Sequence, residues 1–166
     1  MNDPSTIMSQ SELESLKEKF RERIKSKFDP FDRSRNGSCD EREFGTILRS
    51  LGLAPSEEEL ARLLQDCRDD EPSSFLLYER VEMVLIQALL DHQLRGHYKM
   101  PSDEDILQAF QVLDPQKKGF IEADVLREYL SSMGEPFRYK ELDDFFSVSE
   151  FNGLVEYKAY IRKLCT

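Results

Sequence analysis

The segment that decides the fold of this chain is Asp32-Arg33-Ser34-Arg35-Asn36-Gly37-Ser38-Cys39-Asp40-Glu41-Arg42-Glu43. Oxygen-bearing side chains stand at positions 1, 3, 5 and 9 of this segment, a glycine at position 6 and a glutamate at position 12. Apolar residues at helical spacing precede and follow it. A loop of this spacing between two helices can surround a hard cation with oxygens, because the glycine permits the sharp turn.

This spacing is that of an EF-hand calcium loop. The predicted metal ligands are the side chains of Asp32, Ser34, Asn36, Asp40 and Glu43 and the backbone carbonyl of Ser38. Ser34 supplies a neutral oxygen at position 3 and only three of the ligands are carboxylates, so we expect a weak site with a dissociation constant of roughly 10⁻⁵ to 10⁻³ M. Two interpretations stay open: a loop that binds one Ca²⁺, and an empty EF-hand retained as a helix-loop-helix scaffold.

Three further segments repeat the helix-loop-helix layout with lost ligands. In the loop that starts at Asp69, Arg80 stands at position 12, where a cation cannot replace the closing carboxylate. In the loop that starts at Asp114, Lys118 and Val125 stand at positions 5 and 12. The fourth loop is shortened ahead of its glycine, so we expect none of the three to bind calcium.

The repeat predicts an all-α fold of two EF-hand pairs, calmodulin-like, with two-residue β-bridges between paired loops. The bridges are expected at the position-8 residues, which are Cys39, Leu76, Ile121 and Val155. Apolar periodicity and capping residues predict helices over 12–31, 41–51, 56–67, 78–94, 102–113, 124–133, from 136 to about 147, and 157–164. The expected organisation is a disordered tail over 1–10, a first lobe over 11–95, a linker over 96–101 and a second, degenerate lobe over 102–166.

Composition narrows the classes of function. The net charge of −10 argues against nucleic acid as the main partner. The longest apolar run, around Val81–Leu90, is too short to span a bilayer, so no membrane partner is expected. Three scattered cysteines and an N-terminus without an apolar signal region predict a cytoplasmic protein. No phosphate loop, nucleophile elbow or zinc-protease motif is present, so we do not expect an enzyme.

Two helices carry signals of partner binding, each with a plainer explanation. In the helix expected over 78–94, Met83, Ile86 and Leu90 lie beside the predicted core face, and either the protein core or a partner helix would cover them. The helix expected over 12–31 is basic, which suits either an acidic surface such as a tubulin tail or a solvated face with i, i+4 pairs. With 11 Phe and 5 Met, the chain favours one fixed partner over many transient ones.

The stretches Phe44–Gly52, Ala109–Asp114 and Gly134–Phe137 resemble the dynein regulatory complex subunit 8 family, also called EF-hand calcium-binding domain-containing protein 2, within the calmodulin-like superfamily. The resemblance covers roughly residues 15–164. It implies a cytoskeletal protein of the cilium or flagellum axoneme that contacts coiled-coil or IQ-motif subunits and takes part in controlling motility. In this chain Gly37 and the ligand set around it leave room for a calcium response.

The leading hypothesis is therefore a non-catalytic EF-hand adaptor of the axonemal nexin–dynein regulatory complex. The alternative is a calcium-dependent sensor like calmodulin or centrin, in which the loop Asp32–Glu43 switches partner binding. A light chain bound to an IQ helix outside cilia is a third class that the sequence leaves open.

Overall fold

The structure is a computed structural model that describes residues 8–69 and 73–164. The chain divides into two compact units, Met1–Met100 and Pro101–Thr166, each of which is considered by itself. Within the described residues, no helix is both long and apolar enough to cross a membrane.

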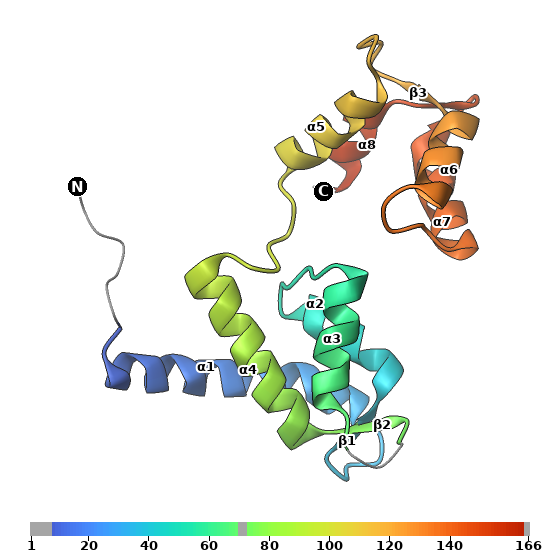
Figure 1. The fold of residues 1–166 in the computed structure, drawn as a ribbon. Coiled ribbons are helices and arrows are strands. Elements are labelled where there is room, and N and C mark those ends of the chain that lie inside the picture. Colours follow the sequence, from blue (N-terminus) through green and yellow to red (C-terminus); the bar gives the residue numbers. More distant parts are fainter. Residues whose placement is uncertain (1–7, 70–72, 165–166) are drawn as a thin grey trace, which may run out of the picture. The chain divides into compact units, whose positions relative to one another are not determined.

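The first unit contains two helix-loop-helix hands. Its elements are α1 (Gln10–Phe28), the 3-10 helix η1 (Asp29–Phe31), β1 (Ser38–Asp40), the 3-10 helix η2 (Glu41–Glu43), α2 (Phe44–Ser50), α3 (Glu57–Cys67), β2 (Phe75–Leu77) and α4 (Tyr78–Arg95). In Figure 1, α1 and α4 lie side by side and β1 lies beside β2. The α-helix ends at Phe28 instead of continuing to Phe31 because Pro30 has no N–H to donate.

Local signals start and stop these helices as the sequence predicts. Ser56 caps α3, since its hydroxyl accepts a hydrogen bond from the Glu59 N–H while the Glu59 carboxylate accepts one from the Ser56 N–H. Gly96 ends α4 in the left-handed conformation at φ 72°. Such caps satisfy backbone groups that a helix end otherwise leaves unpaired.

The core of the first unit is formed by α1, α2, α3 and α4 together with the bridge residues Cys39 and Leu76. The expected core face of α4 is confirmed: its fully or nearly fully buried residues include Val81, Val84, Leu85, Ala88 and Leu89. Leu90 is also buried and Ile86 packs against the same core, so these two are covered by the protein itself, whereas Met83 remains 56% exposed.

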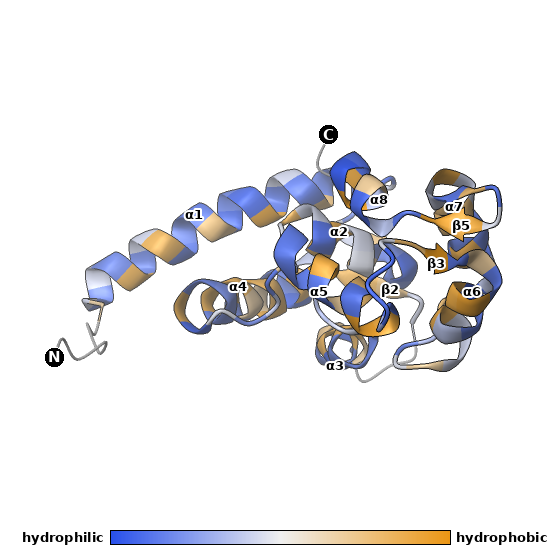
Figure 2. Ribbon diagram, turned by 90° about the horizontal axis from the view of Figure 1, so that it is seen from above, coloured by the Kyte–Doolittle hydropathy of each residue, from blue (hydrophilic) through white to orange (hydrophobic). Residues whose placement is uncertain are grey.

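The second unit repeats the plan in fewer residues. Its elements are α5 (Asp103–Leu113), β3 (Ile121–Glu122), α6 (Ala123–Ser132), α7 (Tyr139–Ser149), β4 (Glu150–Phe151), β5 (Leu154–Val155) and α8 (Tyr157–Leu164). Helix α5 contacts α8 and α6 contacts α7, and Figure 2 colours β5 as hydrophobic. The helix expected from residue 136 starts at Tyr139 because the Glu141 carboxylate accepts a hydrogen bond from the Arg138 N–H, which makes Arg138 the N-terminal cap.

Both expected bridges are present. Cys39 pairs with Leu76 in the antiparallel β1–β2 pair, and Ile121 pairs with Val155 between β3 and β5. All four side chains are buried, which explains why an apolar residue is needed at this position of each loop. The prediction of an all-α fold with paired helix-loop-helix units and short bridges is confirmed.

Two expected boundaries differ from the structure. The predicted disordered tail covers residues 1–10, but α1 begins at Gln10 because Ser9 and Glu12 form a capping box; residues 1–7 of that tail lie outside the described residues. The predicted linker covers residues 96–101, yet Tyr98 packs against the first core and its carbonyl accepts a hydrogen bond from the Ala54 N–H at 2.8 Å. The chain therefore leaves the first unit only after Tyr98.

Candidate functional site

The backbone of the loop Asp32–Glu43 has the turn that a calcium loop requires. Arg35 and Gly37 adopt positive φ angles of 52° and 75°. The Asp32 carboxylate accepts hydrogen bonds from the N–H groups of Asn36 at 3.1 Å and Gly37 at 2.9 Å. Asp32, the first predicted ligand, therefore stabilises the turn of its own loop, because an aspartate side chain can accept hydrogen bonds from nearby backbone N–H groups.

The other predicted ligands lie around one cavity. Five of the six line a cavity of about 520 Å³: Ser34, Asn36, Ser38, Asp40 and Glu43. Phe31, Phe75 and Leu77 supply apolar wall to the same cavity. The Asn36 side-chain oxygen accepts hydrogen bonds from the Ser38 N–H and hydroxyl, at 3.1 and 2.7 Å. Five of the six predicted ligands therefore lie around one cavity, and Asp32 is not among the residues that line it.

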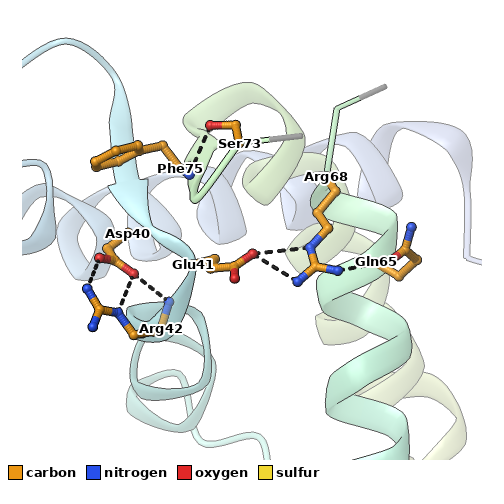
Figure 3. Close-up of polar contacts among 7 residues, drawn as sticks. All are labelled: Asp40, Glu41, Arg42, Gln65, Arg68, Ser73 and Phe75. Carbon is orange, nitrogen blue, oxygen red and sulfur yellow. Dashed lines mark hydrogen bonds and ion pairs between the residues drawn. The ribbon is translucent and has the colours of Figure 1, made fainter. Parts of the chain in front are cut away.

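Two arginines of the same loop form ion pairs with the other predicted carboxylate ligands, Asp40 and Glu43. Arg42 donates to Asp40 through its backbone N–H and its Nε, at 2.9 and 3.0 Å to Oδ1, and through Nη2 at 2.7 Å to Oδ2 (Figure 3). These hydrogen bonds lower the pKa of the Asp40 carboxyl to about 2. Arg33 Nη2 lies 3.9 Å from Glu43 Oε1. In the described part of the chain, no three His, Cys, Asp or Glu side chains converge as metal ligands.

The oxygen donors, their sequence order and the loop backbone fit a Ca²⁺ ion, and Asp40 and Glu43 would have to leave their arginines to join its shell. Sequence reasoning missed the role of Arg33 and Arg42. The role of Arg42 could have been predicted from its position. Asp40 is the N-terminal cap of η2, and an arginine two residues after such a cap is close enough to pair with it.

A cross-hand ion pair secures the exit of this loop. Arg68, at the end of α3, donates from Nε at 3.1 Å and from Nη2 at 2.9 Å to Glu41 Oε2, and from Nη1 to Gln65 (Figure 3).

Next to Asp40, Cys39 is buried in the bridge, and burial raises the pKa of its thiol to about 11. Cys39 therefore behaves as a small apolar residue there.

The three loops that lost ligands are held by protein groups. In the second hand, Arg80 Nε lies 3.3 Å from Asp69 Oδ1, which joins positions 12 and 1 of the loop. In the third hand, Asp114 accepts hydrogen bonds from the N–H groups of Lys118 and Gly119 and from the Tyr157 hydroxyl. In the fourth hand, Asn152 and Gly153 form a tight hairpin turn between β4 and β5.

Paired helix-loop-helix hands joined by short bridges, with a calcium-type loop in the first hand, define a calmodulin-like EF-hand protein. The chain is 36% identical over 151 residues to the Mus musculus protein named dynein regulatory complex protein 8, with 89% of each chain covered. The chain belongs to the dynein regulatory complex protein 8 family.

Other relatives agree with this assignment. The Homo sapiens dynein regulatory complex protein 8 is 39% identical over 113 residues, which cover 68% of this chain and 40% of the human protein. The putative calmodulin-like protein 6 of Oryza sativa is 28% identical over 137 residues, covering 81% of this chain and 77% of that protein. These names describe regulatory and calmodulin-like proteins and indicate no family of enzymes. No family model matches the sequence.

Two solved structures have a similar fold. A chain of the Physarum polycephalum myosin II regulatory domain matches with a TM-score of 0.64 and 25% identity, covering 88% of this chain and 94% of that one. A chain from Mlc1p bound to IQ2 of Myo2p, a class V myosin, matches with a TM-score of 0.61 and 23% identity, covering 86% of this chain and 97% of that one. The second likeness concerns the fold alone.

Proposed function

We propose that this protein is a non-catalytic adaptor of the axonemal nexin–dynein regulatory complex, where it binds helical subunits and contributes to the control of ciliary or flagellar motility. Membership of the dynein regulatory complex protein 8 family supports this place of action. The expected partners are coiled-coil or IQ-motif subunits, and the expected location is the cytoskeleton of the axoneme.

The observation that carries the proposal is that the second unit exposes many large apolar side chains. None of the residues of α5 is buried, although Leu107, Phe110 and Leu113 pack partly against the core of that unit. The large apolar side chains exposed in this unit are Val112, Val125, Met133, Phe137, Tyr139, Val148, Phe151 and Leu164. Val112 and Phe151 are 78% and 77% exposed. Single exposed apolar side chains are common, whereas a patch of several is typical of protein-binding sites, and we infer that these residues form such a patch.

A helical partner suits this surface, because an amphipathic helix presents apolar residues at i, i+3, i+4 and i+7 to an apolar face. The first unit is suited to a supporting role, since most of its large apolar residues are already in its own core. Microtubule contact through α1 has less support: its basic residues Lys17, Arg21 and Lys25 are paired with Glu14, Glu18 and Asp29 in i, i+3 or i, i+4 ion pairs. These pairs fit a solvated basic face of α1, whereas Phe20, Ile24 and Phe28 of the same helix are buried in the core.

The test is recovery of the complex from detergent-extracted axonemes of cells that express the tagged chain, in buffer containing a calcium chelator. We expect other subunits of the regulatory complex to co-purify stoichiometrically without calcium. The double variant Val112→Asp and Phe151→Asp should lose them, whereas Leu94→Asp, which changes a 56% exposed residue of α4, should retain them. A purified regulatory complex that lacks this chain would exclude the proposal.

A second function is supported by the loop Asp32–Glu43, which we propose as a weak Ca²⁺ site with the ligands Asp32, Ser34, Asn36, Ser38, Asp40 and Glu43. In this alternative calcium changes affinity for the partner. A single weak site has little differential binding energy with which to rearrange a unit, so we rank this function second. Calorimetric titration with calcium should show one saturable site that Glu43→Gln abolishes, and partner binding in calcium and in chelator should differ only in the wild type.

A further inference from the structure

In the first loop, the side chain of an arginine forms an ion pair with a predicted metal ligand. Asp40 stands at position 9 and Arg42 at position 11, and the Arg42 guanidinium donates to both carboxylate oxygens, at 3.0 Å from Nε and at 2.7 Å from Nη2. We propose that Arg42 is an internal counter-ion that competes with Ca²⁺ for Asp40 and thereby sets the calcium affinity of the loop. This inference rests on the calcium site proposed above.

Arg42 and a metal ion would compete for the same carboxylate. Oδ1 of Asp40 accepts two hydrogen bonds from Arg42 and Oδ2 accepts one, so most of the lone pairs that a metal, or a metal-bound water, would use are already engaged. Figure 3 shows the Asp40 side chain directed at Arg42. Asp32 differs, because it accepts hydrogen bonds from backbone N–H groups of its own loop and, among the residues that the structure describes, it forms no ion pair with a side-chain cation.

The competition is weak enough to be reversed by a divalent ion. The Arg42 side chain is 85% exposed and the Asp40 side chain 28% exposed, so the released guanidinium returns to water at little cost. Exposed ion pairs contribute at most about 1 kcal/mol, which corresponds to about fivefold in a binding constant. Arg42 therefore tunes the affinity of the loop and does not abolish binding.

The other end of the loop has a looser version of the same arrangement. Arg33, at position 2, lies 3.9 Å from Glu43, the predicted closing ligand at position 12. The second hand has Arg80 itself at position 12, 3.3 Å from Asp69. Both hands of the first unit thus pair a loop carboxylate with an arginine. Only the first hand has a glutamate at position 12 that could bind a metal.

The experiment is calorimetric titration of the full-length protein with CaCl₂, comparing wild type, Arg42→Gln, Arg42→Lys and Arg49→Gln. Arg49→Gln is the matched control, because it also removes one positive charge from an exposed ion pair, Arg49–Glu57 at 3.0 Å, and Arg49 does not line the loop cavity. We expect Arg42→Gln to bind calcium about fivefold more tightly than wild type, with Arg49→Gln changing affinity less than twofold. Arg42→Lys should lie between, because lysine keeps the charge but lacks the fork.

Each result decides the proposal. Tighter binding in Arg42→Gln that disappears in Arg42→Gln combined with Glu43→Gln supports it and assigns the gain to the first loop. Equal affinities of Arg42→Gln and Arg49→Gln overturn it, as does the absence of binding heat in every variant up to millimolar calcium. Recovery of axonemal subunits in chelator tests the adaptor function separately, so failure of one experiment leaves the other proposal standing.

Discussion

The Tyr157 hydroxyl donates a 3.0 Å hydrogen bond to Oδ2 of Asp114, across two hands of the second unit. Asp114 stands at position 1 of a loop that lost its ligands at positions 5 and 12, and it is 4% exposed. Its second oxygen and the same Oδ2 accept the backbone N–H groups of Lys118 and Gly119. An aspartate typical of metal binding thus serves as the structural centre of its loop, with a phenol from the neighbouring hand as a fixed donor.

Replacement of Tyr157 by Phe should destabilise the second unit, because it removes one donor from a buried acceptor. We expect its melting temperature to fall by about 4–8 °C, the shift typical when a domain of this size loses one hydrogen bond. Thermal unfolding followed by circular dichroism measures this change. Tyr139→Phe is the control, since Tyr139 is 87% exposed and should leave the curve unchanged. Equal curves for both variants would contradict a structural role for the Tyr157 hydroxyl.

Helix α4 offers a matched pair for testing the first core. Leu85 is fully buried, whereas Leu94 on the same helix is 56% exposed. Leu85→Ala should lower the free energy of unfolding by about 2–5 kcal/mol, because it removes buried methyl groups and leaves a cavity. Leu94→Ala should change it by less than about 0.5 kcal/mol. Urea denaturation distinguishes the two, and a similar loss in both variants would mean that α4 is not packed as described.

Asp40 should titrate at an acid pH that depends on Arg42. The Arg42 side chain and N–H hold the pKa of Asp40 at about 2, below its ordinary value of 3.8, and Arg42→Gln should move it toward 3.8. Because the folded-state pKa is depressed, the stabilisation from this pair is present above pH 3.8 and is lost as the pH falls toward 2. Carboxyl NMR titration measures the shift. Asp105, whose pKa is lowered by Ser102 in the second unit, should titrate identically in both proteins.

The hairpin turn of the fourth hand should depend on glycine for conformational reasons alone. Gly153 has a φ of 77°, and a Cβ added there would meet no atom within 4 Å. Gly153→Ala should therefore lower the free energy of unfolding of the second unit by about 1–2 kcal/mol, the cost of a left-handed non-glycine residue. Asn152→Gly, at a φ of 53°, should be tolerated. Chemical denaturation compares the two, and a neutral Gly153→Ala would exclude this turn geometry.

The helices and bridges could be predicted because their signals are local. Ser56 with Glu59, and Ser102 with Asp105, lie three residues apart, so the cap is complete before any tertiary contact forms. The same signal at Ser9 and Glu12 shows that α1 starts earlier than the apolar pattern alone indicates. Tyr98 could not be assigned to the first unit from sequence, because its packing depends on where the chain turns after Gly96.

The sequence by itself determined the loop spacing at Asp32–Glu43, the position-8 residues that form the bridges and the helix caps. Each of these depends on residues a few positions apart, whose geometry follows from backbone conformation. Only the tertiary structure decided that Tyr157 satisfies Asp114, 43 residues away, and that Arg68 joins Glu41 across two hands. Such pairs form only after the helices pack. Arg42 and Asp40 are only two residues apart, yet the orientation of Arg42 toward Asp40 depends on how η2 turns at the end of β1.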